Sequence, residues 1–94
     1  DKQELDTMFQ YLDDTFVSKG IPVIIDETGC VNKNENTSAR VAWFSYYLST
    51  AKKHGIKCFI WDNNETKNGF GLLNRKDCTW YYPKIIEAIQ NATK

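Results

Sequence analysis

Two short apolar runs, separated by an amphipathic stretch, most constrain the fold that this 94-residue chain can adopt. The first run covers residues 21–25 and the second 56–61. Both are rich in β-branched or aromatic residues and read as strands of a parallel sheet that is covered on both faces. Consecutive parallel strands need a crossover connection, and residues 38–54 supply one with helical spacing. Asn36 or Thr37 is the expected N-cap of this crossover helix.

Helical spacing of apolar residues predicts a further helix on each side of the strand pair. The first helix has about four turns, and Gly20 behind it suits a left-handed cap. The last begins at Pro83, which suits the first turn of a helix, and runs through Ala92. Residues 30–37 and 62–79 are predicted loops. The apolar positions of the first helix are Leu5, Met8, Phe9, Leu12 and Phe16.

The predicted order is therefore helix, strand, helix, strand, helix, within one domain at most. Two parallel strands leave two unpaired edges, and such a pair is too small to form an independent sheet in water. We therefore expect residues 1–94 to be part of a larger α/β fold. The missing strands would come from another part of the same protein or from a second chain.

Composition narrows the classes of partner. The chain has 12 basic and 12 acidic residues, so its net charge gives no electrostatic reason to expect nucleic acid or an anionic membrane as partner. No apolar run approaches the roughly 20 residues that span a bilayer. Three cysteines without a CxxC spacing, and a single histidine, argue against a zinc site. We expect three free thiols, with one disulfide as the alternative, and no metal or cofactor.

A carboxylate stands directly behind the first apolar run. In parallel α/β folds the carboxyl ends of the strands carry the active site, and a charge in such a position is costly without partners. Glu27 is therefore the leading catalytic candidate, with a surface or helix-capping glutamate as the alternative. Asp26 is adjacent, but neighbouring strand residues point to opposite faces, so we expect it to be a poor second carboxylate.

An aromatic residue and a polar pair end the second run. Trp61 offers a flat apolar face that matches the C–H face of a sugar ring, and a core tryptophan is the alternative. Asp62 and Asn63 have side chains that can bind hydroxyl groups or form an Asx-type turn. We expect Trp43 and Trp80 to pack within the protein rather than bind a ligand.

Five segments, which together cover nearly the whole chain, carry a family resemblance. They are Phe16-Val-Ser-Lys-Gly-Ile-Pro-Val-Ile-Ile-Asp-Glu-Thr-Gly29, Arg40-Val-Ala-Trp-Phe-Ser-Tyr-Tyr47, Cys58-Phe-Ile-Trp-Asp-Asn63, Phe70-Gly-Leu-Leu-Asn-Arg75 and Trp80-Tyr-Tyr-Pro83. Taken together, these segments resemble the C-terminal part of family 5 glycoside hydrolases, the cellulases or endo-β-1,4-glucanases. The strand-7 pattern of that family reads like I-P-V-I-I-G-E-F-G, and its strand-8 pattern like C-F-W-W-D-N.

The resemblance implies a C-terminal fragment of a (β/α)₈ TIM barrel: helix 6, strand 7, helix 7, strand 8 and helix 8. Glu27 then matches the nucleophile of a retaining mechanism, and Trp61 matches the aromatic platform beneath the sugar. Asp62 and Asn63 are weaker candidates for substrate contact. The implied substrate is a β-glucan polysaccharide, the implied location is outside the cell, and the implied partner is the N-terminal part of the same barrel.

The chain departs from the family pattern near the nucleophile, where Asp26 replaces a glycine and Thr28 a phenylalanine. The family's general acid/base glutamate lies upstream, in a region that these residues do not include. A retaining site needs two carboxyl groups about 5–5.5 Å apart, so we expect this chain alone to hydrolyse nothing. Two other hypotheses remain: a non-catalytic carbohydrate-binding or scaffold piece, and a small α/β interaction module in an oligomer.

Overall fold

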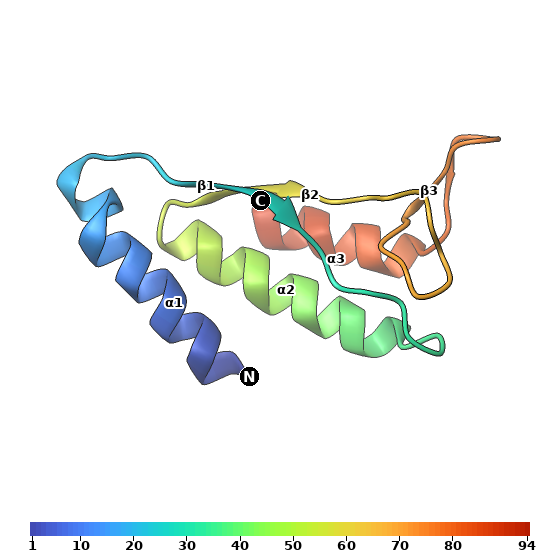
Figure 1. Cartoon of the computed structure of the whole chain (residues 1–94), viewed down its shortest axis with the longest axis horizontal. Helices are drawn as coiled ribbons and strands as arrows, with labels where there is room; N and C mark the ends of the chain where they lie inside the picture. Colours follow the sequence, from blue (N-terminus) through green and yellow to red (C-terminus); the bar gives the residue numbers. More distant parts are fainter.

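A computed structural model describes all residues 1–94 and places three helices along one side of a two-stranded sheet (Figure 1). The predicted order of helices and strands is confirmed, and the two long strands are parallel neighbours. No helix is both long and apolar enough to cross a bilayer. The elements are α1 (Lys2–Thr15), the 3-10 helix η1 (Val17–Lys19), β1 (Ile24–Thr28), α2 (Thr37–Lys53), β2 (Lys57–Ile60), β3 (Leu73–Asn74), β4 (Thr79–Trp80) and α3 (Pro83–Thr93).

The helix ends follow local capping chemistry, with two differences from expectation. Asp1 caps α1, since its Oδ1 accepts a hydrogen bond from the Gln3 amide at 2.8 Å. Gly20 adopts the left-handed conformation with φ of 81°, but it ends η1 rather than α1. Asn36 occupies the N-cap position of α2, yet its Oδ1 accepts from the Lys33 amide in the preceding loop and not from the helix.

The segment predicted as one loop over residues 62–79 contains a small antiparallel hairpin of β3 and β4. Each strand has only two residues, which is too short to show an alternating pattern in the sequence. Trp80 in β4 is 50% exposed, so within this chain it does not pack as we expected. Trp43 does pack, since its ring stacks on that of Tyr47 with 4.5 Å between centroids.

The core lies between the sheet and the helices and is small. Only 13 of 94 residues are buried, which is few for an independent domain of this length. One cluster joins α2, α3 and the loop before β3, and the other joins α1 to α2 and β2. Their buried members are Phe44, Leu48, Leu72 and Ile85 in the first, and Phe9, Ala51 and Ile56 in the second.

The opposite face of the sheet has no cover within the chain. Ile24 is 59% exposed and Phe59 is 61% exposed. The expectation that both faces of the strands are covered is therefore not met by these residues alone, because all three helices lie on one side (Figure 1). Exposed apolar side chains on a parallel strand pair indicate a missing layer or further strands.

Candidate active site

The two parallel strands end at the same edge of the sheet, and this edge holds the candidate site. The amide of Trp61 donates a hydrogen bond to the carbonyl of Thr28 at 2.8 Å. Glu27, one residue before Thr28, is exposed, and Trp61 is 40% exposed. The structure thus brings the two leading sequence candidates to neighbouring strands at one level. The two side chains lie at the carboxyl ends, where active sites of parallel α/β folds form.

A β-bulge in β1 changes the direction of the side chains at this edge. The ladder pairs are Ile24 with Lys57, Ile25 with Cys58 and Thr28 with Ile60. Asp26 and Glu27 therefore lie opposite the single residue Phe59. Both carboxylates are exposed, whereas the following Thr28 is buried at 1% exposure. The expectation that Asp26 and Glu27 face opposite sides is wrong, because the extra residue interrupts the alternation.

The thiols beside this edge are poorly suited to nucleophilic chemistry. Burial raises the pKa of Cys58, with the neighbouring Thr28 side chain acting in the opposite direction. Burial also raises the pKa of Cys30, with Arg40 acting in the opposite direction. All three cysteines are free, as expected, but at neutral pH these two stay protonated. The carboxylates are left as the candidate nucleophiles.

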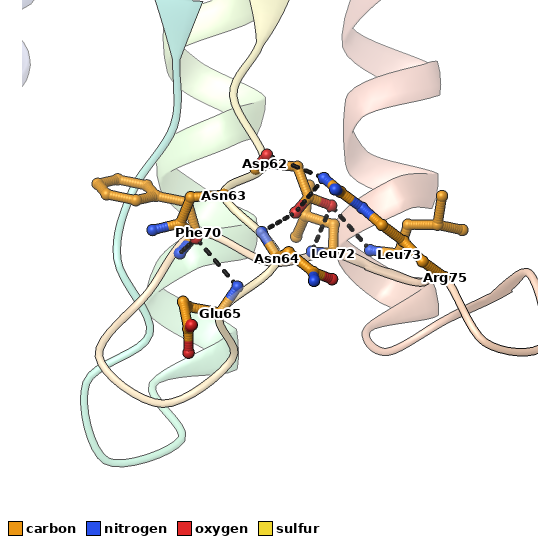
Figure 2. A network of polar contacts seen from close by, with 8 residues as sticks. All are labelled: Asp62, Asn63, Asn64, Glu65, Phe70, Leu72, Leu73 and Arg75. Atoms are coloured by element: carbon orange, nitrogen blue, oxygen red, sulfur yellow. Dashed lines mark hydrogen bonds and ion pairs between the residues drawn. The ribbon is translucent and has the colours of Figure 1, made fainter.

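Asp62 anchors the loop that follows β2 (Figure 2). Its carboxylate accepts hydrogen bonds from the backbone amides of Asn64, at 2.8 Å, and of Leu72 and Leu73, both at 3.0 Å. Arg75 lies 3.5 Å from the same carboxylate. Burial alone would raise the pKa of Asp62, but the three amides and the guanidinium outweigh it and leave this pKa below its usual value.

Asn63 also stabilises this loop, through hydrogen bonds to its backbone. Its Oδ1 accepts from the amides of Glu65 at 3.2 Å and of Phe70 at 3.0 Å (Figure 2). The turn-forming alternative that the sequence left open is thus what the oxygens of Asp62 and Asn63 do in this structure. Substrate contact by these two residues stays a prediction, with the Asn63 amide nitrogen as the remaining free donor.

The loop after β2 also packs against the loop after β1. A Cβ on Gly29 would lie 3.1 Å from the Phe70 ring and 3.5 Å from the Trp61 carbonyl, so only glycine fits comfortably there. The Asn32 amide donates to the Gly69 carbonyl at 2.9 Å. These contacts hold the segments behind Glu27 and behind Trp61 together.

Arg40 is the residue at this site whose role the sequence analysis missed. It sits in the first turns of α2, and its side chain is 1% exposed. One signal was available, since Arg40 lies four residues before Phe44 and eight before Leu48, on the buried stripe of the helix. A charged residue in that register indicates a specific polar contact.

Comparison with known proteins gives the same family as the motifs. The family model described as "Cellulase (glycosyl hydrolase family 5)" matches residues 1–67. Endoglucanase A of Clostridium longisporum is 48% identical over 93 residues, which are 95% of this chain and 18% of that protein. The chain thus spans about a fifth of the length of this curated relative.

Solved structures of the same family match the fold. A family 5 lichenase from Caldicellulosiruptor sp. F32, solved as a mutant in complex with cellotetraose, superposes with a TM-score of 0.93 and 42% identity. The match covers 99% of this chain and 26% of the lichenase. A broad-specificity endoglucanase from Clostridium cellulovorans also gives a TM-score of 0.93, at 38% identity, over 100% of this chain and 28% of that one.

The uncovered sheet face now has an explanation, since in a closed barrel it faces the interior and both strand edges are paired. The order helix, strand, helix, strand, helix corresponds to the C-terminal part of such a barrel. The chain belongs to glycosyl hydrolase family 5, the cellulase family, and forms a C-terminal piece of its TIM barrel.

Proposed function

We propose that this segment supplies the nucleophile and a sugar platform to a retaining endo-β-1,4-glucanase. Glu27 is the nucleophile, and Trp61 stacks beneath the sugar whose bond is cleaved. The observation that supports this most directly is the hydrogen bond between the Trp61 amide and the Thr28 carbonyl at 2.8 Å. That bond fixes the end of the nucleophile strand against the residue that carries the aromatic ring.

The proposed chemistry depends on the exposed carboxylate of Glu27 at the carboxyl end of β1. Glu27 attacks the anomeric carbon and forms a glycosyl ester, while the leaving oxygen takes a proton from an acid elsewhere in the site. Water then cleaves the ester and restores the configuration. The stacked ring of Trp61 holds the sugar so that this carbon lies within reach of the carboxylate.

The bulge supports the assignment because Glu27 is exposed there, at the carboxyl end of β1, although it directly follows the exposed Asp26. Asp26 is also exposed beside Glu27, so the experiment must show which of the two carboxylates is the nucleophile. The two residues are distinguishable by isosteric substitution, because Glu27→Gln and Asp26→Asn each remove one charge and keep the side-chain shape.

The test uses a complete barrel that contains this segment, with carboxymethyl-cellulose and an aryl cellobioside as substrates. Glu27→Gln should lower kcat by at least about 10³-fold, because the covalent step has no nucleophile. Asp26→Asn should retain far more activity. Glu65→Gln is the matched control, since Glu65 is an exposed carboxylate in the loop after β2, at the same end of the barrel.

Chemical rescue separates loss of the nucleophile from damage to the site. Azide should restore turnover of the aryl glycoside by Glu27→Gly and yield a glycosyl azide of inverted configuration. Rescue of Asp26→Gly instead, with an active Glu27→Gln, would transfer the nucleophile role to Asp26. Binding of cello-oligosaccharides by a parent protein that hydrolyses none of them would favour the non-catalytic alternative.

The substrate and the location follow from the same proposal. The lichenase and the broad-specificity endoglucanase act within the β-glucan class by their names, and we propose a β-glucan polymer for this site too. Such a polymer lies outside the cell, so the protein should act as a secreted enzyme. Its detection in culture medium, with activity on cellulose and mixed-linkage glucan, checks both statements.

A further inference from the structure

Arg40 is buried without a counter-ion. Its side chain is 1% exposed, no carboxylate lies within ion-pair distance, and both terminal guanidinium nitrogens are buried with no hydrogen-bond partner. Taking a charge out of water in this way is costly. A buried polar group of this kind calls for a specific explanation.

Arg40 contacts both the loop behind the proposed nucleophile and the start of α3. Its Nε donates to the Cys30 carbonyl at 3.2 Å, three residues beyond Glu27. Its guanidinium lies over the Tyr82 ring, with 5.0 Å between the central carbon and the ring centroid. Tyr82 is the N-cap residue of α3. Arg40 therefore joins the end of β1 to two helices through one planar group.

Tyr82 in turn connects Arg40 to the loop behind Trp61. The Tyr82 hydroxyl accepts from Asn32 Nδ2 at 3.0 Å, and the same nitrogen lies 2.7 Å from the Thr66 carbonyl and 3.3 Å from a Glu35 carboxylate oxygen. Asn32 is itself buried. Thr66 belongs to the loop anchored by Asp62. The contacts thus run from Arg40 through Tyr82 and Asn32 to the segment that follows β2.

We propose that Arg40 is a positioning residue, which acts through the Cys30 carbonyl and Tyr82 to fix Glu27 relative to Trp61. The inference rests on the proposed function, because it assigns a purpose to the site described there. In this role the guanidinium stacks on the Tyr82 ring and directs its Nε–H at the Cys30 carbonyl. A flexible aliphatic side chain can fill only part of the same space and has no N–H to donate to that carbonyl.

The decisive variant is Arg40→Met in a complete barrel, because methionine keeps an unbranched apolar stem and removes the guanidinium with its donor. The probe is an activated 2-fluoro cellobioside, which forms a long-lived ester with the nucleophile. The labelled fraction counts folded, competent sites, and the rate constant of labelling reports how well the nucleophile is placed. A merely structural role would lower the labelled fraction and leave the rate constant of the folded molecules unchanged.

Misplacement of a reacting group by about 1 Å can cost on the order of 10²-fold in rate. We therefore expect Arg40→Met to label fully but at least about tenfold more slowly, with KM within about threefold of the parent. Lys52→Met is the matched control, since it removes an exposed cation from the other end of α2. It should label like the parent.

Full labelling of Arg40→Met at a rate constant within about twofold of the parent would overturn the inference. If Arg40→Met does not fold, Tyr82→Phe decides instead, because it removes only the hydroxyl that Asn32 contacts. It should label about threefold more slowly, and an unchanged rate constant overturns the inference. A parent that is not labelled on Glu27 refutes the proposed function, and this inference with it. A parent labelled there beside an unaffected Arg40→Met refutes the Arg40 role alone.

Discussion

At the scale of single residues, the position of the proposed sugar platform depends on the carboxylate that follows it. Asp62 comes directly after Trp61 and accepts from three backbone amides across the loop. Three such bonds to one charged group stabilise the charged form and tie residues 62 to 73 into a closed loop. The ionisation of Asp62 and the order of this loop are therefore linked.

The first prediction concerns the pH dependence of this link. Because the pKa of Asp62 is lower in the folded protein than its ordinary value of 3.8, the stabilisation is present above pH 3.8. It is lost as the pH falls through the lower, folded pKa. In ¹⁵N-leucine-labelled barrel, the amide protons of Leu72 and Leu73 should shift together, with a midpoint below that value. A midpoint at or above it, or different midpoints for the two amides, would contradict the shared hydrogen bonding.

At the scale of elements, regular structure was predictable and the irregular features were not. The helices showed through apolar spacing, and the parallel strand pair showed through two apolar runs joined by a crossover of sufficient length. The bulge at Asp26 and Glu27 was not predictable, because it depends on how β1 aligns with β2 and not on either run alone. The hairpin of β3 and β4 was missed since two-residue strands carry no pattern.

Some residues of the candidate site were likewise predictable from the sequence, and others were not. The positions of Glu27 and Trp61 at neighbouring strand ends were predictable, because both residues stand directly behind strand-like runs and the family patterns contain them. Arg40 was missed because its contact with the Cys30 carbonyl depends on the tertiary structure. The residue type alone does not predict such a partner. The same holds for Asn32, whose partners lie 34 and 50 residues away in the sequence.

The second prediction tests how closely the loop after β2 is packed. A Cβ on Gly69 would overlap the backbone carbonyl of Glu65, and backbone cannot move aside as a side chain can. Gly69→Ala should therefore destabilise the barrel by roughly 1–3 kcal/mol and raise KM for cello-oligosaccharides. Gly20→Ala is the comparison, because its Cβ would meet nothing within 4 Å and only its φ of 81° opposes the change.

Chemical denaturation and steady-state kinetics should separate the two glycine variants. Gly20→Ala should cost about 1–2 kcal/mol through left-handed strain alone and leave KM unchanged, since it lies at the other end of β1. Equal KM values for both variants would show that the loop tolerates a methyl group at Gly69. The loop after β2 would then be less closely packed than its backbone contacts indicate.

At the scale of the whole molecule, the chain carries half of the proposed site on strands that are covered on one face only. The helices cover one face of the sheet, while Ile24 and Phe59 on the other face are largely exposed. The proposed mechanism needs a second carboxyl group about 5–5.5 Å from the first, which the relatives' additional length can supply. We therefore expect the rest of the barrel both to cover the open sheet face and to supply the missing carboxyl group.

The last prediction follows from this coincidence. Prepared alone, residues 1–94 should associate with increasing concentration and bind a dye that reports exposed apolar surface, because two strand edges and one sheet face are open. The same sample should hydrolyse no carboxymethyl-cellulose. Co-expression with the N-terminal part of a family 5 barrel should give a single heteromeric species, lower dye binding and restore hydrolysis, and Glu27→Gln in this segment should abolish that hydrolysis. A monodisperse, cooperatively unfolding monomer of residues 1–94 would mean that the open face is tolerated. The segment would then fold without the rest of the barrel, even though the family relationship holds.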